Sequence, residues 1–263
     1  MFKRYLMEQR MLSAEEKERM RRKKLRKKKM RRKKRRIFFL ECATLIALLV
    51  VLFVVHQNRY DNVPPEIVEF VEKYPEAKSF ATNYNAYADS DKPINIEKEL
   101  KTDGIPLFIQ WDKRWGYKDY GGNYIGIAGC GPTCLSMVLC GITDNDKNPY
   151  EVAMFSNEQG YYTYGQGTSW NLMTEGAAAL GVYSESGTIS EEYILDNLSK
   201  DTPMICSMKP GDFTYTGHFI VLAGIDENGN IIVNDPNSPK NSAKSWSVEK
   251  LVPQIKAIWK FES

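Results

Sequence analysis

Residues 129–141 read GCGPTCLSMVLCG, and this stretch decides the fold. Glycines flank Cys130 on both sides, and Pro132 suits the first turn of a helix, where its missing N–H is not needed. The residues that follow are mostly apolar, so the sequence predicts a short helix that is buried all round. We expect Gly141 to close this helix with a left-handed residue.

Cys130 is predicted to stand at or just before the N-terminus of this helix. Unpaired amides and the positive end of the helix dipole favour a thiolate there. The glycine neighbours leave the sulfur uncovered, so that the backbone of a substrate can approach it. The alternative is that Cys130 is one more small core residue, a role that suits the mid-helix Cys134 and Cys140 better.

Charge is distributed unevenly along the 263 residues, whose net charge is only +3. Residues 1–36 contain 19 Lys and Arg and 4 Asp and Glu, a net of +15, whereas the remainder contains 17 basic and 29 acidic residues, a net of −12. An acidic body lacks the basic face that nucleic acid requires, so we expect no nucleic-acid partner. The five cysteines and two histidines have no zinc-site spacing, and we expect no metal, no cofactor and no disulfide framework.

A continuous apolar run, residues 37–55, follows the basic cytoplasmic tail of residues 1–36 and is interrupted only by Glu41 and Thr44. Nineteen helical residues span about 28 Å, close to the thickness of the hydrocarbon core of a bilayer. A cleavable signal would have a shorter apolar core and a small-residue cleavage site, so we predict an uncleaved, single-pass transmembrane helix. The basic tail would stay in the cytoplasm and contact anionic lipid, which places the C-terminal body outside the cell membrane.

Residues 56–104 are predicted to be a stalk or lead-in, and residues 105–263 the folded domain. Pro64-Pro65 begins a short helix whose apolar positions suit a docked surface, and the polar remainder of the lead-in either wraps the domain or forms a spacer. In the domain, helical patterns precede strand patterns, which predicts an α+β fold with an antiparallel sheet. We expect the last strand, residues 255–261, at an edge of that sheet.

His218 is the one histidine of the body, and it begins an apolar strand pattern, residues 218–223. A hairpin turn at residues 226–230 returns the chain, so Asp235 is predicted to lie near the His218 end. An acidic partner there can fix the tautomer of the imidazole and support its charged form. Asn234 or Asn237 is an alternative partner, and Asp235 alternatively forms an Asx turn before Pro236.

Three segments together resemble the papain-like cysteine peptidases of the bacteriocin-leader (double-glycine) peptidase-like family. They are Gly129-Cys130-Gly131-Pro132-Thr133, Gly217-His218-Phe219-Ile220-Val221-Leu222 and Val233-Asn234-Asp235-Pro236. Gln110-Trp111-Asp112, ahead of Trp115 and Tyr120-Gly121, resembles the family's opening motif. The resemblance covers about residues 105–240 and is specific as a set.

The resemblance implies a papain-like fold, in which the nucleophile helix packs on an antiparallel sheet. It implies Cys130 as nucleophile, His218 as base and Asp235 as the residue that orients the histidine. It also implies that Gln110 donates to the oxyanion beside the backbone N–H of Cys130. Leader peptidases of this family sit on transporters and act in the cytoplasm, whereas the body of this chain is expected to face outward.

The function predicted from the sequence is that of a membrane-anchored, extracytoplasmic bacterial cysteine peptidase that hydrolyses peptide amide bonds. A peptidoglycan-directed amidase or endopeptidase is one alternative, because the same triad serves both substrates. An inactive papain-like surface binding module is the other. Six aromatic residues either line a substrate cleft or pack in the core: Trp111, Trp115, Tyr161, Tyr162, Tyr164 and Trp170.

Overall fold

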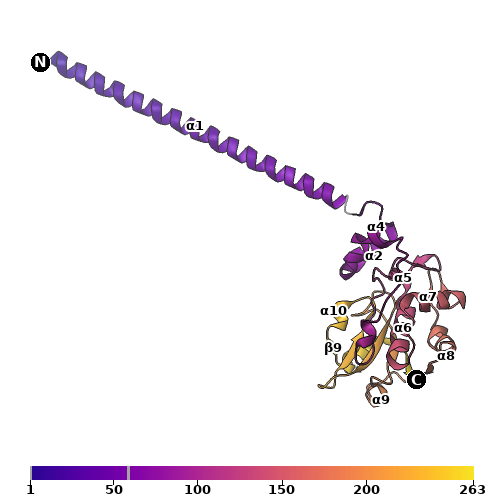
Figure 1. The fold of residues 1–263 in the computed structure, drawn as a ribbon. Coiled ribbons are helices and arrows are strands. Elements are labelled where there is room, and N and C mark those ends of the chain that lie inside the picture. Colours follow the sequence, from indigo (N-terminus) through magenta and orange to yellow (C-terminus); the bar gives the residue numbers. More distant parts are fainter. Residues whose placement is uncertain (1, 58–59) are drawn as a thin grey trace. The chain divides into compact units, whose positions relative to one another are not determined.

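The computed structural model describes residues 2–57 and 60–263, which divide into two compact units, Met1–Asp61 and Asn62–Ser263. In the first unit, helix α1 (Phe2–Gln57) runs without a break through the basic tail and the apolar run (Figure 1). Its segment Glu15–Val54 contains a stretch long and apolar enough to cross a membrane, and the protein does not bury it. Length and composition therefore support one membrane-spanning helix.

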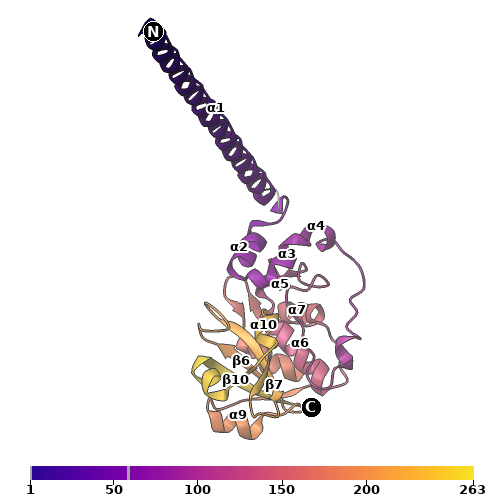
Figure 2. The same cartoon turned by 90° about the vertical axis from the view of Figure 1, so that its left-hand side faces the viewer.

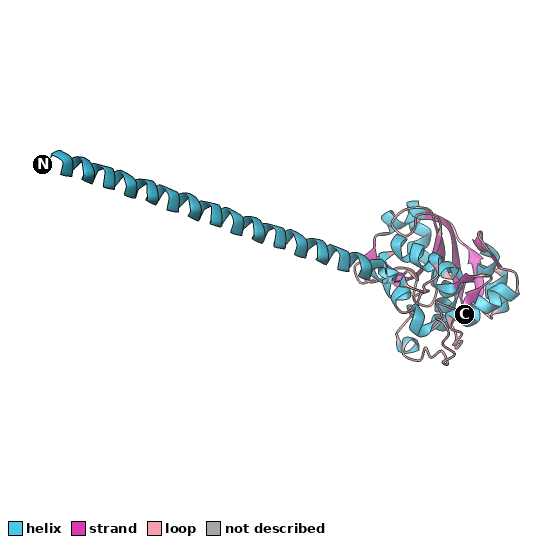
Figure 3. Cartoon of the chain, turned by 90° about the horizontal axis from the view of Figure 1, so that it is seen from above, coloured by secondary structure: helices cyan, strands magenta, loops and turns pink. Residues whose placement is uncertain are grey.

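The second unit is built on a six-stranded antiparallel sheet with the strand order β5-β10-β6-β7-β8-β9. Figure 3 shows strands in magenta among the helices of this unit. The strands are β5 (Tyr183–Ser186), β6 (Met204–Met208), β7 (His218–Ile225), β8 (Ile231–Asn234), β9 (Ser245–Trp246) and β10 (Ile255–Glu262). The α+β, papain-like architecture predicted from the sequence is confirmed. β10 is not an edge strand, however, because β5 pairs with it on its outer side.

Strand β7 is apolar after His218 because both faces of the sheet are covered at this point. In β7, Phe219 and Val221 point into the core beneath α6 (Cys130–Ile142), while Ile220 and Leu222 point into a second core. That second core contains Ile194 of α9 (Glu191–Asn197) and Leu251 of α11 (Val248–Leu251). Successive side chains of a strand face opposite sides, so a strand between two cores needs no polar positions. Figure 2 shows α6 beside β7, on which it packs.

Helix α6 is buried nearly all round, as its sequence predicts: every residue from Gly131 to Leu139 is buried. Its end differs from the prediction. Gly141 is inside the helix, and Thr143 caps it in an extended conformation. A Cβ on Gly141 would lie 2.4 Å from Cδ1 of Ile105, so close packing rather than a left-handed turn calls for glycine here.

From Asn62 onward, the lead-in packs onto the domain instead of extending from it. It contains α2 (Pro65–Lys73), η2 (Pro75–Ala77), α3 (Lys78–Thr82), α4 (Tyr84–Tyr87) and η3 (Glu99–Lys101). The ring of Phe80 stacks on that of Tyr117 with the centroids 4.7 Å apart, and the Tyr117 hydroxyl donates to the carbonyl of Phe80 at 2.7 Å. Ile67, Phe70 and Val71 bury the inner face of α2, as their spacing predicts.

Shorter elements connect these parts. They are β1 (Asp119–Tyr120), β2 (Asn123–Tyr124), α5 (Ile125–Ala128), α7 (Pro149–Glu158), β3 (Tyr162–Thr163), β4 (Gly167–Thr168), η4 (Trp170–Met173), α8 (Glu175–Ala179), α10 (Pro239–Ser242) and η5 (Val252–Gln254). η4 and α8 are separated at Thr174, whose backbone angles are φ −118° and ψ −84°.

Candidate active site

Cys130 is the first residue of α6, and Gly129 is its N-cap. Close packing explains the glycines on both sides. A Cβ on Gly129 would lie 2.5 Å from the carbonyl oxygen of Ile125, and one on Gly131 would lie 2.8 Å from Cγ2 of Thr168. The two glycines therefore allow the start of α6 to pack directly against α5 and against the Thr168 side chain of β4.

His218 begins β7, the strand on which α6 packs, so the fold brings it to Cys130. His218 is 8% exposed. Its Nε2 lies 2.7 Å from Oδ1 of Asp235, and the Cys130 side chain is near enough to help raise the pKa of the imidazole. The three residues predicted to form the site therefore lie in one connected group.

Asp235 follows β8, which pairs with β7 through Val221 and Asn234, and this register returns it to the His218 end of the hairpin. The side chain is fully buried. Oδ1 also accepts from the backbone N–H of Asn237 at 2.9 Å, and Oδ2 accepts from Nδ2 of Asn241 at 2.9 Å. These donors hold the carboxylate in one orientation towards the histidine.

The alternative partners for His218 have other roles. Nδ2 of Asn234 donates to the carbonyls of Ile105 and Pro106 at 3.0 and 3.3 Å. The backbone N–H of Asn237 binds Asp235, and among the described residues its side-chain Oδ1 is buried without a partner. The carboxylate of Asp235 is thus the group that contacts the imidazole.

The electrostatics favour a thiolate–imidazolium pair. Burial by itself raises the pKa of the Cys130 thiol, but the hydrogen bond and charge of His218, with the backbone N–H groups of Phe219 and Gly131, hold that pKa below its ordinary value. Burial by itself lowers the pKa of His218, whereas the charge and hydrogen bond of Asp235 and the contact with Cys130 raise it above its ordinary value. By contrast, burial raises the pKa of Cys134 and, at Cys140, raises it to about 12.

Gln110 reaches the same cleft, with its side chain 2% exposed. Its Nε2 donates to the carbonyls of Gly126 and Ile127 at 2.9 and 3.3 Å, and its backbone N–H donates to the carbonyl of Pro236 at 2.8 Å. The side chain of Gln110 is therefore held by carbonyls of α5, and its backbone is held by the loop after Asp235. The role of Gln110 as an oxyanion donor stays a prediction, in which an oxyanion would take the place of the longer bond to Ile127.

The cleft around these groups encloses about 340 Å³. One wall comes from α2 and the residue after it, which sequence reasoning missed because this segment precedes the catalytic motifs. The residues of that wall are Glu66, Glu69, Phe70, Lys73 and Tyr74. The aromatic residues considered from the sequence do not line this cleft, and Trp115 and Tyr162 are buried in the core.

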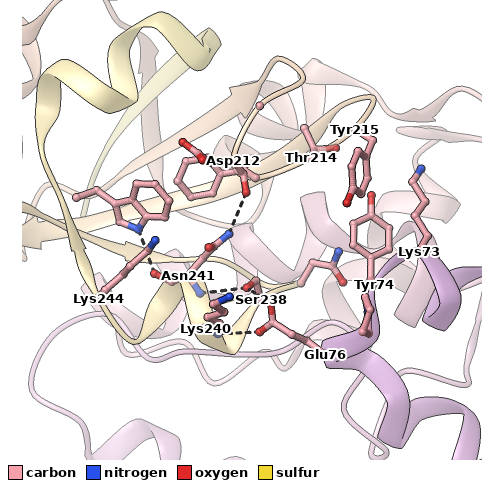
Figure 4. A pocket seen from close by; sticks show the side chains of 15 residues that line it. Lys73, Tyr74, Glu76, Asp212, Thr214, Tyr215, Ser238, Lys240, Asn241 and Lys244 are labelled. Atoms are coloured by element: carbon pink, nitrogen blue, oxygen red, sulfur yellow. Dashed lines mark hydrogen bonds between the residues drawn. The ribbon is translucent and has the colours of Figure 1, made fainter.

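A second cavity of about 350 Å³ lies next to the cleft and shares Lys73, Tyr74 and Asn237 with it. Figure 4 shows the rings of Tyr74 and Tyr215 side by side at one end of this cavity, with centroids 5.9 Å apart. Ser238, the N-cap of α10, also lines it with Lys240 and Asn241 of that helix, and Asn241 donates to Asp235.

Comparison with known proteins identifies the family of this chain. The model of the peptidase C39-like family matches residues 102–261. A crystal structure of a double-glycine motif protease from an AMS/PCAT transporter, in complex with the leader peptide, is similar at 19% identity and a TM-score of 0.34, covering 60% of this chain and 91% of that one. No curated protein matches the sequence. Because the family match spans more than half of its length, the chain belongs to the peptidase C39-like family and is a cysteine peptidase.

Proposed function

We propose that this peptidase hydrolyses peptide amide bonds through a triad of Cys130, His218 and Asp235. The observation that carries the proposal is the imidazole of His218, which contacts the buried carboxylate of Asp235 at 2.7 Å and lines the same cleft as Cys130. A nucleophile, a base and an orienting group in one open cleft are the arrangement that covalent catalysis needs.

The chemistry follows from these contacts. The Cys130 thiolate attacks the carbonyl carbon of the substrate, and the carbonyl oxygen takes up the electron pair as an oxyanion. The imidazolium of His218 gives its proton to the amine as the C–N bond breaks, which leaves a thioester on Cys130. His218 then removes a proton from water, the hydroxide attacks the thioester, and the carboxylic acid product and the thiolate separate.

The oxyanion is proposed to be bound by the backbone N–H of Cys130 and the side chain of Gln110. Both lie at the cleft, and Gln110 is held there by three hydrogen bonds. Donors fixed before the reaction stabilise the oxyanion without reorganising.

The body is proposed to act outside the cytoplasm, anchored by α1. The 19 Lys and Arg of residues 1–36 adjoin the apolar run, and basic residues beside a membrane span remain on the cytoplasmic side. The same residues suit a surface of anionic lipid. A peptide on the outer side is therefore the proposed substrate.

The test is hydrolysis of fluorescently labelled casein by the full-length protein in detergent, together with labelling by a peptidyl acyloxymethyl ketone. We expect hydrolysis and labelling of Cys130 in the wild type, and neither in Cys130→Ala. Hydrolysis that survives in Cys130→Ala would contradict the proposal. The same assay on purified cell walls tests the alternative of a peptidoglycan-directed amidase or endopeptidase, which predicts that the wild type hydrolyses the cell walls.

A further inference from the structure

The segment from Pro65 to Ala77 lies outside the residues that match the family, yet it reaches the catalytic group. Its helix α2 supplies one wall of the cleft, as described above. Its Glu76 contacts the loop that follows Asp235. One carboxylate oxygen of Glu76 accepts from the Ser238 hydroxyl at 2.7 Å, and the other accepts from the backbone N–H of Lys240 at 2.9 Å (Figure 4).

These contacts continue to the imidazole of His218. The Ser238 hydroxyl, which donates to Glu76, accepts from the backbone N–H of Asn241 at 3.0 Å. The side chain of Asn241 in turn donates to Oδ2 of Asp235 at 2.9 Å. Asp235 binds His218 at 2.7 Å, and His218 lowers the pKa of the Cys130 thiol. A carboxylate of the lead-in is therefore linked to the imidazole through Ser238, Asn241 and Asp235.

We propose that Glu76 is a positioning residue for the catalytic group, acting through Ser238 and Asn241 on the carboxylate of Asp235. This inference rests on the proposed function of Cys130, His218 and Asp235. Because the Ser238 hydroxyl donates its hydrogen to Glu76, the lone pairs of the hydroxyl oxygen are directed towards the backbone N–H of Asn241. The lead-in is then a working part of the peptidase rather than a tether.

The groups that face Asp235 and His218 limit what else can produce this effect. The titratable side chains of the lead-in that line the cleft with Cys130 and His218 are Glu66, Glu69, Lys73 and Tyr74. Burial, together with the charges of Cys130, Tyr215 and Asp235, raises the pKa of the Tyr74 phenol. A neutral phenol cannot replace the charge of Glu76. Asn241 is also held by Trp246, whose Nε1 donates to its carbonyl at 3.1 Å, so loss of Glu76 loosens Asn241 without releasing it.

Two matched controls separate positioning from simple docking of the lead-in. Tyr117→Phe removes a docking hydrogen bond of 2.7 Å to Phe80 and leaves the link to Asp235 intact. Glu72→Gln removes a carboxylate from the exposed face of α2 that lines neither cavity. Both are compared with Glu76→Gln and Glu76→Ala in the full-length protein in detergent. The readouts are thermal unfolding, casein hydrolysis and the rate at which iodoacetamide alkylates Cys130 at different pH values.

Positioning predicts that Glu76→Ala slows casein hydrolysis about three- to tenfold, the order expected when two solvent-accessible, charge-assisted hydrogen bonds that act indirectly on Asp235 are lost. It also predicts that the acid limb of Cys130 alkylation moves to higher pH, because a looser Asp235 supports the imidazolium less well. Glu76→Gln, which keeps one acceptor, should fall between Glu76→Ala and the wild type. Tyr117→Phe and Glu72→Gln should keep the wild-type profile, even where Tyr117→Phe unfolds at a lower temperature.

Identical alkylation profiles for Glu76→Ala and Tyr117→Phe would overturn the inference and leave a docking role only. Failure of the proposed function has a different signature, in which wild-type Cys130 reacts no faster than a free thiol. In that case every variant would share the same slow profile.

Discussion

At the scale of single residues, the proposed mechanism depends on how Asp235 acts on His218. The carboxylate is fully buried and accepts from the imidazole and from two further donors. A buried negative charge in direct contact raises the pKa of the imidazole, and the imidazolium in turn lowers the pKa of the Cys130 thiol.

Asp235→Asn keeps the shape of this residue and removes its charge. We expect kcat/KM for casein to fall about 10²-fold or more, because the imidazolium loses its partner and the histidine loses its fixed tautomer. Thermal unfolding recorded on the same sample controls for folding. Retention of wild-type kcat/KM in a folded Asp235→Asn protein would show that Asp235 has no part in catalysis.

The role of Gln110 is tested by comparing two reactions of the Cys130 sulfur, amide hydrolysis and alkylation. Hydrolysis passes through an oxyanion, so Gln110→Ala should lower kcat about 10²-fold, which corresponds to a loss of about 3 kcal/mol of transition-state stabilisation. Alkylation by iodoacetamide forms no oxyanion, so the rate at Cys130 should stay near that of the wild type. Equal losses in both reactions would indicate that Gln110 supports the geometry of Cys130 and does not bind the oxyanion.

At the scale of secondary-structure elements, the glycine beside the nucleophile fixes how closely α6 approaches β4. A Cβ on Gly131 would overlap with Thr168, whose hydroxyl lies 3.1 Å from that of Tyr120. We expect Gly131→Ala to lower the free energy of unfolding by about 1–3 kcal/mol, the usual effect of overpacking.

Gly217→Ala is the matched control for this substitution, because a Cβ on Gly217 meets nothing within 4 Å. Denaturant unfolding should show a change of less than about 0.5 kcal/mol for this variant. If both glycine variants unfold alike, close packing is not the reason for glycine at position 131.

Local patterns in the sequence were enough to predict the elements that carry the chemistry. The glycines and proline around Cys130 predict the start of α6, and the hairpin after residue 225 predicts that Asp235 returns to the level of His218. Both inferences use neighbours in the sequence or one turn of known length. The α+β class follows from the order of the elements for the same reason.

Features that depend on distant pairing could not be predicted. Tyr183–Ser186 is short and mostly polar, so nothing local marks it as β5 or places β10 in the interior of the sheet. Glu76 and Asn241 are 165 positions apart, and only the folded chain brings them to one loop. The wall of the cleft formed by α2 is likewise a product of tertiary packing.

At the scale of the whole molecule, the basic tail and the apolar run of α1 predict one topology. A membrane-impermeant probe of the acyloxymethyl ketone class should label Cys130 on intact cells, because the body is proposed to face outward. The Cys130→Ala strain controls for other targets. Labelling that requires permeabilised cells would place the body in the cytoplasm.

The central claim is that Cys130 is a thiolate held by the His218 imidazolium, and the pH profile of its alkylation tests this most directly. Iodoacetamide is reacted with full-length wild type and His218→Ala, and modification of Cys130 is measured by mass spectrometry. We predict that the wild-type rate is nearly constant from about pH 6 to 8, whereas that of His218→Ala rises about tenfold per pH unit towards the ordinary thiol pKa of about 8.5. A wild-type profile that rises in parallel with that of His218→Ala would contradict the account.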